Sequence, residues 1–474
     1  MLSENSPVSS PRIVIIGGGV AGALVAIQLL KRSAPGTVLT LVERTPPVGR
    51  GVAYGTNSCA HLLNVPVERM GAFPEAPGDF LRWVGERLGR PRFPAAVAPG
   101  DFLPRCIFGE YIAYLLTEAR QRADPGIAFT VRTGEVVDLS ERSTGDGARV
   151  YFADETELVA DRVILAIGNL PGEYPVRSGR QVYRSWRYVH VPWQPGAIER
   201  IAPDADVLIA GQGLSAADIV LELADQGHRG RIFCLSRRGL RHKPHVPGGV
   251  YRDFLAGETA PITLLALFRR IRREVRAAAA GGVSWEGVID AIRPHSHRLW
   301  QALDWRERAR FLRHVRPYWE IHRHRLAPET DRRLSALEAS GQASFLAGRF
   351  VHLEETPDGL RVTYRRRDAA ADEFLHVAKL INCTGPRSDY SKYQHPLLVN
   401  LLARGLIDHD PLALGVSALP TGQVLRYRGG PIPWFYTLGA PLKGVLWEST
   451  AVPEIRRQAV VVADELLGAE SGAA

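Results

Sequence analysis

The chain has 474 residues, 45% of them hydrophobic, which is enough for two or three packed domains. Its 59 basic residues against 50 acidic ones give a formal charge of +9, and all but five of the basic residues are arginines. These arginines are spread along the chain, and the densest run, within residues 264–280, alternates with apolar residues at helical spacing. A solvated helix face explains that run, so the charge does not indicate a nucleic-acid partner.

The N-terminal region predicts a buried strand and helix behind a disordered tail at residues 1–11. Residues 13–30 carry no charge and are long enough to resemble a membrane span, but their four glycines stand between a strand pattern and a helix pattern. We therefore expect no membrane segment and a cytoplasmic location. No CxxC motif is present, which fits a reducing compartment and a protein without a metal site. The four cysteines are Cys59, Cys106, Cys234 and Cys383.

The first glycine motif, Gly17-x-Gly19-x-x-Gly22, follows the apolar stretch RIVIIG and precedes a helical pattern. Glycines at this spacing allow a tight turn, close approach of the backbone to a pyrophosphate, and tight packing of the helix. The helix N-terminus then offers unpaired N–H groups to the phosphates. Glu43 ends the next predicted strand, where a carboxylate can accept both ribose hydroxyls and would repel a 2′-phosphate. The motif therefore predicts a cradle for FAD or NAD.

A second motif of the same kind is formed by Gly211, Gly213, Ser215 and Ala216. Arg237 stands as far after Gly211 as Glu43 stands after Gly17, so a guanidinium replaces the acid, and Arg238 follows it. Two arginines at the end of this strand suit a 2′-phosphate through charge-assisted hydrogen bonds. The second cradle is therefore expected to prefer NADPH, with NADH possible. The alternative is a pair of surface arginines without a ligand.

Two β-meander patterns mark where the chain passes between domains. Residues 134–171 and 348–386 each show short strands joined by turns, followed by an apolar strand that closes at Gly168 or Gly385. We predict an α/β fold of two nested Rossmann-like domains. Two dinucleotide motifs, two glycine-closed strands and no CxxC motif together resemble the flavin monooxygenases, whose fold is similar to that of glutathione reductase. The outer domain is expected at 12–172 and 346–474. The inserted domain is expected at 173–345, with a helical insertion at about 256–345.

The region 256–345 is rich in helical patterns and in aromatic residues of a spacing typical of a core. Within it, RHVRPYWEIHRHR (313–325) gathers seven arginines and histidines. Such side chains would suit an anionic, planar substrate. The alternative is that they line the domain interface or pair with Glu320 and Glu329.

Longer strings indicate a family: GRGVAYGT, HLLNVPVERMGAFP, DFLRW, HVRPYWEIHRHRLAPE, NCTGP and GVLWESTAVPEIR. Together they resemble the bacterial FAD/NAD(P)-binding flavoprotein monooxygenases, a family that includes an FAD-dependent urate hydroxylase and an L-aspartate N-monooxygenase. The resemblance covers about residues 11–460. It implies that the outer domain binds FAD and the inserted domain NADPH.

The resemblance also implies roles for particular residues. Gly17, Gly19, Gly22 and Glu43 would hold the adenosine diphosphate of FAD, and residues 49–54 and 61–66 would follow its ribityl chain and ring. Asn64 would lie at the ring edge, although it could equally cap a turn before Pro66. Gly439 would lie near the flavin, although a packing role is the alternative. The other FAD-binding candidates are Arg44, Tyr54, Gly168 and Gly385, and the candidates for catalysis are Asn64, His61 and Arg316.

The function implied is an FAD-dependent, NAD(P)H-consuming monooxygenase that uses O₂ and hydroxylates a small polar substrate through a C4a-(hydro)peroxyflavin. Urate, converted to 5-hydroxyisourate, is the predicted substrate because it is one of the activities assigned within the resembling family. The first alternative is N-hydroxylation of an amino-acid amine. A flavin reductase or dehydrogenase without oxygen insertion, and a non-catalytic FAD-binding protein, are the others.

Overall fold

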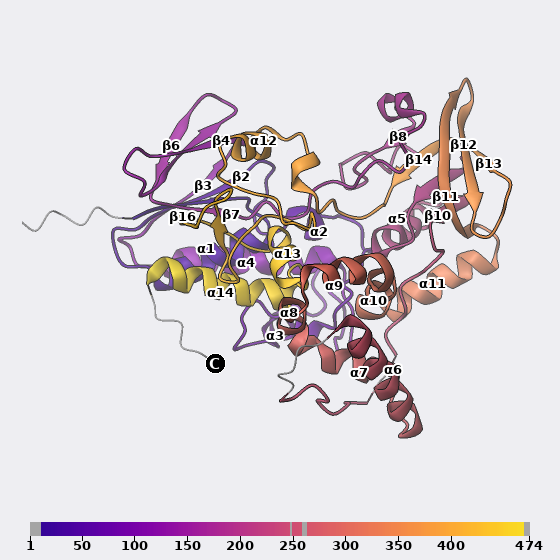
Figure 1. Ribbon diagram of the computed structural model, residues 1–474, viewed down its shortest axis with the longest axis horizontal. Helices are drawn as coiled ribbons and strands as arrows, with labels where there is room; N and C mark the ends of the chain where they lie inside the picture. The colour runs from indigo at the N-terminus through magenta and orange to yellow at the C-terminus, as the bar shows by residue number, and fades with distance from the viewer. Residues whose placement is uncertain (1–10, 247–248, 258–262, 469–474) are drawn as a thin grey trace, which may run out of the picture.

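The computed structural model describes residues 11–246, 249–257 and 263–468, so nearly all of the tail predicted at 1–11 lies outside the described residues. The chain forms two α/β domains with a set of helices beneath them (Figure 1). We call residues 11–172 and 384–468 domain 1, and residues 173–383 domain 2. The two nested Rossmann-like folds predicted from the glycine motifs are confirmed.

Domain 1 is built on a six-stranded sheet of order β15-β16-β7-β1-β2-β3. Neighbouring strands are parallel except for the β15–β16 pair. The strands are β1 (Arg12–Ile16), β2 (Val38–Glu43), β3 (Ala128–Thr133), β7 (Arg162–Leu165), β15 (Gln423–Leu425) and β16 (Pro431–Thr437). In the central strand β1, Ile13–Ile16 form an unbroken apolar run because this part is buried on both faces of the sheet.

Helices cover one face of this sheet and a smaller antiparallel sheet covers the other. The first layer comprises α1 (Val20–Arg32), α4 (Arg105–Arg122) and α14 (Val452–Leu467), with α3 (Asp79–Gly85) beyond α4. The second comprises β4 (Val136–Glu141), β5 (Ala148–Phe152), β6 (Glu157–Ala160) and α12 (Pro396–Ala403). Both layers leave free the carboxyl ends of the parallel strands, where ligands bind in such sheets.

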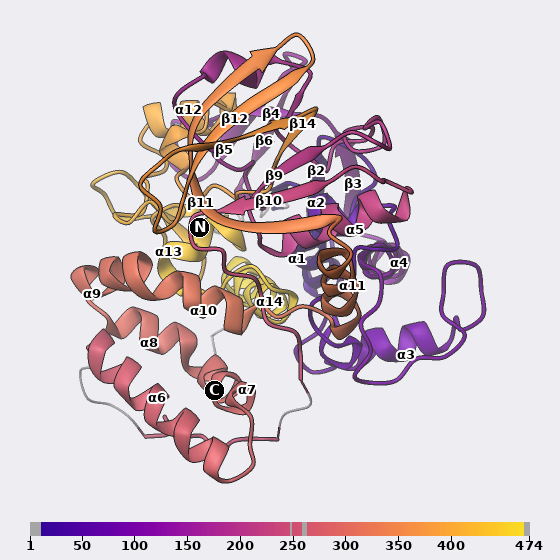
Figure 2. The same ribbon diagram turned by 90° about the vertical axis from the view of Figure 1, so that its right-hand side faces the viewer.

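Domain 2 is built on a seven-stranded sheet of order β13-β12-β11-β10-β9-β14-β8. The strands are β8 (Tyr188–Val189), β9 (Val207–Ala210), β10 (Ile232–Ser236), β11 (Ala343–Thr356), β12 (Gly359–Arg366), β13 (Glu373–Val377) and β14 (Lys379–Asn382). Helices α5 (Leu214–Asp225) and α11 (Pro328–Ala339) pack on it, and Figure 2 shows the long β11–β12 pair rising from the sheet.

The boundary predicted at residue 346 is wrong. Strand β11 pairs in parallel with β10, and β14 pairs in parallel with β9, so the whole second meander belongs to domain 2. The chain therefore returns to domain 1 only after β14. The sequence could not place this boundary, because a strand shows its own pattern but not the strand with which it pairs.

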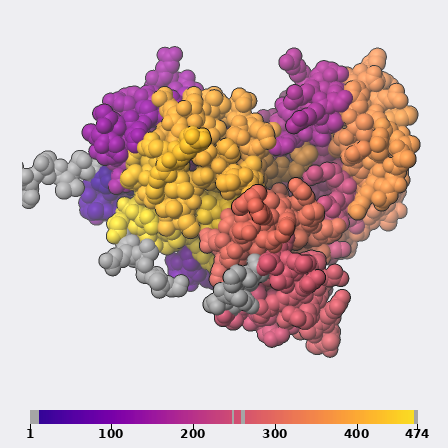
Figure 3. All heavy atoms as spheres, in the orientation of Figure 1, coloured from indigo at the N-terminus to yellow at the C-terminus, as the bar shows by residue number. Residues whose placement is uncertain are grey.

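The helical insertion is shorter than the predicted 256–345. It comprises α6 (Leu264–Ala280), α7 (Trp285–Ile292), α8 (Ser296–Ala302), α9 (Trp305–Arg310) and α10 (Arg316–Arg323), which we call the insertion helices. Helix α11 is excluded because it packs on α5 and β11 as part of domain 2. In Figure 3 the insertion helices abut the yellow C-terminal segment of domain 1. None of the helices in the described ranges is both long and apolar enough to span a membrane.

Trp300 joins the insertion helices to domain 1. Its indole Nε1 donates a hydrogen bond to the Gly444 carbonyl at 2.8 Å, and its ring stacks on Trp447 with centroids 4.9 Å apart. Gly444 is the second residue of the short helix α13 (Lys443–Leu446). Because the Trp300 ring is only 3% exposed, its contacts are shielded from water.

We expect Trp300→Phe to lower the free energy of unfolding by about 1–2 kcal/mol, through loss of one buried hydrogen bond and part of a ring contact. Denaturant unfolding followed by tryptophan fluorescence measures this change. Trp305→Phe is the matched control, since that ring is 64% exposed and its replacement should cost less than about 0.5 kcal/mol. Equal losses for the two variants would contradict the joining role of Trp300.

Candidate functional site

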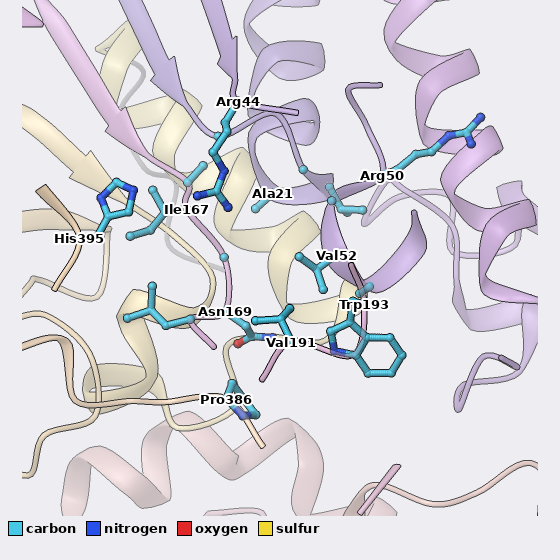
Figure 4. Close-up of a pocket in the computed structure, with 18 of the residues that line it drawn as sticks. Ala21, Arg44, Arg50, Val52, Ile167, Asn169, Val191, Trp193, Pro386 and His395 are labelled. Atoms are coloured by element: carbon cyan, nitrogen blue, oxygen red, sulfur yellow. The ribbon is translucent and has the colours of Figure 1, made fainter. Parts of the chain in front are cut away.

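A cavity of about 440 Å³ lies between the two domains at the carboxyl ends of their parallel strands. Domain 1 contributes its glycine motif, the end of β2, the short helix α2 (Gly51–Tyr54) and the turn after β7. Domain 2 contributes Ser215, the segment 190–193 and the end of β14. Figure 4 shows side chains from both domains around this space, with Ala21 and Ile167 facing Val191 and Trp193 across it. The cavity therefore reaches from the first predicted dinucleotide motif to Ser215 of the second, while Gly211 and Gly213 are not among its lining residues.

The first glycine motif has the geometry that the spacing predicts. Gly17 has φ +108°, and a Cβ there would lie 2.4 Å from the Ala166 carbonyl oxygen. A Cβ on Gly22 would lie 1.9 Å from the Gly17 oxygen, so this glycine lets α1 pack against the turn. Gly19 caps the N-terminus of α1 and lines the cavity. The free N–H groups of this helix can therefore face a pyrophosphate in the cavity.

Glu43 is held in place at the end of β2 and lines the same cavity. Its carboxylate accepts hydrogen bonds from the backbone N–H groups of Gly18 and Thr45, both at 2.8 Å. Each carboxylate oxygen keeps a second lone pair that a ribose hydroxyl can use. The neighbouring Arg44 also lines the cavity, and Figure 4 shows its guanidinium bent toward Ile167. Its role in cofactor binding stays a prediction.

Helix α2 brings Tyr54 to the cavity, as predicted for the segment 49–54. Burial raises the pKa of Tyr54 to about 12, so its hydroxyl stays protonated. The same helix is flanked by Arg50, which also lines the cavity and whose Nε is buried without a hydrogen-bond partner among the described residues. In Figure 4 the Arg50 side chain runs away from Val52 toward α4.

The second glycine motif repeats this arrangement in domain 2. Gly211 has φ +130°, and a Cβ there would lie 2.1 Å from the Cys383 carbonyl oxygen. Gly213 caps the N-terminus of α5, Ser215 lines the cavity, and Ala216 is buried against the sheet. The backbone of this turn can therefore approach a second pyrophosphate as closely as the first motif approaches its own.

Arg237 and Arg238 follow β10 beside this turn. Arg237 is exposed and, within the described ranges, forms neither a hydrogen bond nor an ion pair. Arg238 donates a long hydrogen bond of 3.5 Å to the Arg313 carbonyl and lies over the Tyr318 ring. The Arg237 guanidinium is thus available to an anionic ligand, as the assignment to a 2′-phosphate requires.

The glycine-closed strands meet at the cavity. Gly168 after β7 and Gly385 after β14 have φ of +66° and +88°, and both line the cavity. Gly439, also predicted at the flavin, is not among the lining residues. Its N–H donates to Gln458 Oε1 at 2.7 Å, and a Cβ on it would lie 3.9 Å from Ala21, so it packs behind a lining residue.

The three candidates for catalysis do not come together. His61 is buried between Thr56, whose hydroxyl lies 2.7 Å from Nδ1, and Glu222 of domain 2, 3.1 Å from Nε2. Asn64 lines a different cavity, where its carbonyl accepts a hydrogen bond from His245. Arg316 lines neither cavity and lies 3.4 Å from Glu320. No group of three or more possible metal ligands occurs in the part of the chain that the structure describes.

Several lining residues were not predicted from the sequence. Asn169 follows the Gly168 turn, and His190 and Trp193 belong to a linker between the domains. A residue directly after a glycine-closed strand is a signal that could have indicated Asn169. No local pattern indicates Trp193, because its position depends on how the two domains meet. Thr450, before α14, lines the cavity from the C-terminal segment.

Comparisons with known proteins agree with this geometry. Residues 14–170, about a third of the chain, match a family described as FAD-NAD(P)-binding. The structure is similar to reduced ornithine hydroxylase from Pseudomonas aeruginosa, with a TM-score of 0.66 and 17% identity over 97% of this chain and 99% of that one. Ornithine N-hydroxylase from Kutzneria sp. 744, in complex with reduced FAD, NADP⁺ and L-ornithine, gives a TM-score of 0.61 and 16% identity over 98% and 100% of the chains. The chain has the fold of these hydroxylases.

The family match and this fold identify FAD and NAD(P) as the cofactors. The residues present fit them, because Gly17 and Gly211 let each turn pack directly against the neighbouring strand end, and the N-terminus of α1 or α5 that follows offers free backbone N–H groups to a pyrophosphate. A curated relative, salicylate hydroxylase from Sarocladium schorii, is 27% identical over 180 residues, which are 34% of this chain. The chain thus spans about a third of the length of the curated relative it matches.

Proposed function

We propose that the protein is an FAD-dependent monooxygenase that consumes NADPH and hydroxylates a small polar substrate. The observation that carries this proposal is the single cavity that reaches from the Gly17 turn to Ser215 of the second motif. Such a cavity allows a nicotinamide held by domain 2 to approach a flavin held by domain 1. When bound, FAD would accept a hydride and activate O₂.

The protein's own groups would bind and orient the two cofactors and keep water out of the cavity. The N-termini of α1 and α5 face the two pyrophosphates, and Glu43 holds the adenosine ribose of FAD. Arg237 selects the phosphorylated nicotinamide cofactor. Apolar side chains from both domains line the cavity, among them Leu170 and Trp193. They would exclude water from the place where O₂ reacts, which limits the loss of activated oxygen to side reactions with water.

For the substrate we favour the amine of a small amino acid, one of the alternatives left open by the sequence. Two hydroxylases that share the fold over nearly the whole chain are named for ornithine. The preference for urate rested on family resemblance alone, and none of the three relatives described above is named for urate. Urate therefore enters the test below as a competing substrate.

A disulfide reductase is the strongest competing function, because related folds occur in thioredoxin reductases. The chain has no CxxC motif. Cys383 lines the cavity, but burial raises its pKa well above the usual range, so the thiol stays protonated and unreactive. This chemistry favours oxygen insertion over dithiol exchange.

We expect the purified protein to be yellow and to lose its flavin absorbance when NADPH is added without oxygen. In air, a true substrate should increase NADPH oxidation and O₂ uptake together, and a screen of small amino acids, diamines and urate identifies it. A flavin that NADPH does not reduce would refute the proposed function. Loss of the urate absorbance band only when NADPH is present would restore urate as the substrate.

A further inference from the structure

The second glycine of each dinucleotide motif faces a particular group across the turn. This position lacks a side chain so that the backbone can approach a pyrophosphate. At Gly19 of the first motif, the nearest neighbour of an added Cβ would be Gly51, 3.5 Å away, which opens α2 and lines the cofactor cavity. At Gly213 of the second motif, the nearest neighbour would be Nε2 of His242, 3.7 Å away. His242 therefore borders the side of the second motif from which a pyrophosphate approaches.

The loop after β10 holds His242 in this position. It is the loop that begins with Arg237, the residue expected at the 2′-phosphate. The backbone N–H of Lys243 donates a hydrogen bond to the Ile321 carbonyl at 3.0 Å, which fixes the loop to α10. The His242 side chain is half-buried, and its Nδ1 donates to the His324 carbonyl. The imidazole is thus held by a backbone contact and by a bond of its own.

The bond to His324 determines which ring nitrogen of His242 carries the proton. A carbonyl oxygen only accepts hydrogen bonds, so in the neutral ring the proton lies on Nδ1 and Nε2 has a free lone pair. Nε2 forms no hydrogen bond to any described residue, and it is not one of the polar atoms that are buried from solvent. A ligand bound at the second motif can therefore reach Nε2.

The groups around His242 keep its ring neutral in the free protein but can support a charge. Burial lowers the pKa of His242 to about 4, and the nearby His324 acts in the same direction while Glu320 opposes it. Although burial works against it, the charges of His324, Lys443 and Arg316 lower the pKa of Glu320 to about 2, so this carboxylate stays ionised. The first turn of α5 carries no acid. Glu320 is therefore the anion that would stabilise a protonated His242.

A bound pyrophosphate would change this balance. Its oxygens repel the lone pair of a neutral Nε2, whereas a protonated ring can donate a charge-assisted hydrogen bond to them. We propose that His242 takes up a proton when NADPH binds and donates a hydrogen bond from Nε2 to the pyrophosphate. This inference rests on the proposed function, because it requires NADPH at the second motif.

Proton uptake makes the binding of the nucleotide depend on pH. Because the neutral ring of the free protein must gain a proton, a lower pH favours binding, by up to about tenfold for each pH unit. The gain in affinity is complete below about pH 4, where the free ring is already protonated, and it declines as the pH rises through the pKa of the bound ring. The 2′-phosphate of the nucleotide also titrates, at about pH 6, so its contribution must be subtracted.

The test is isothermal titration calorimetry of NADP⁺ into the FAD-loaded protein at about pH 6.5, in buffers of different ionisation enthalpy, which gives the number of protons taken up. The unmodified protein should take up at least about half a proton more than His242→Gln, whose amide can replace the Nε2 donor but does not titrate. The 2′-phosphate is present in both titrations, so its contribution cancels. His314→Gln, at an exposed histidine, is the matched control and should behave as the unmodified protein.

His242→Asn is the second variant, because asparagine can keep the bond to the His324 carbonyl but is too short to replace Nε2. It should weaken NADP⁺ binding at least about fivefold and remove the additional proton uptake. Proton uptake equal to that of the unmodified protein in either folded variant would overturn the proposal.

If neither variant folds, the unmodified protein is titrated with 2′-AMP, which has the 2′-phosphate but no pyrophosphate. NADP⁺ should take up more protons than 2′-AMP, and equal uptake would overturn the proposal. Reduction of the flavin by NADPH is recorded on the same preparations, and its failure would refute the proposed function. Flavin reduction and NADP⁺ binding without proton uptake at His242 would refute this inference alone, whereas the absence of NADP⁺ binding would refute both.

Discussion

Gly17→Ala should yield a colourless protein that retains less than about a tenth of the bound flavin. The added Cβ would lie 2.4 Å from the Ala166 carbonyl oxygen, at a φ of +108° that alanine rarely adopts. Either the turn moves or the segment directly after β7 that carries Ala166 moves, and both form the cradle proposed for the pyrophosphate. The measurement is the ratio of flavin absorbance to protein absorbance after purification and again after reconstitution with excess FAD.

Gly78→Ala is the matched control for this substitution. Gly78 precedes α3 with an ordinary φ of −88°, and a Cβ there would meet no atom within 4 Å. That variant should keep its full flavin content. A yellow Gly17→Ala protein with normal flavin content would show that the first glycine turn does not bind the cofactor, and the proposed function would fail with it.

Arg237→Ala should raise the KM for NADPH by about 10–100-fold and leave the KM for NADH nearly unchanged. A charge-assisted hydrogen bond to a phosphate contributes about 1.5–3 kcal/mol. NADH has no 2′-phosphate and does not form this bond, so its binding should not change. The side chain is exposed and forms no bond to another described residue, so its removal should not disturb the fold. Steady-state NADPH and NADH oxidation by the same preparation measures both constants.

The NADH result is the internal control for this variant. Equal losses with the two nucleotides would mean that Arg237 acts on the shape of the site and that the 2′-phosphate assignment is wrong. Increasing ionic strength should weaken NADPH binding to the unmodified protein more than NADH binding, because the contact at this exposed position is screened by salt. Arg237→Ala should remove that difference.

The sequence by itself determined the two dinucleotide turns. In each, the glycines, the strand before them and the helix after them are neighbours along the chain, so a local pattern contains the whole motif. The positions of Glu43 and Arg237 at the ends of the following strands could be predicted for the same reason. The two glycine-closed strands, ending at Gly168 and Gly385, were also recognised, and they meet at the cavity as their shared pattern indicated.

Only the tertiary structure decided which sheet the second meander joins, and it assigns β11–β14 to domain 2. It also separated the sequence candidates, placing His61 in an interdomain contact and Asn64 at the second cavity. Arg323, one of seven arginines and histidines in a short run, became distinct only when its burial and its ion pairs with Glu448 and Glu454 were known. The physical reason is common to these cases: strand pairing and burial depend on residues far apart in the chain, and no local pattern carries that information.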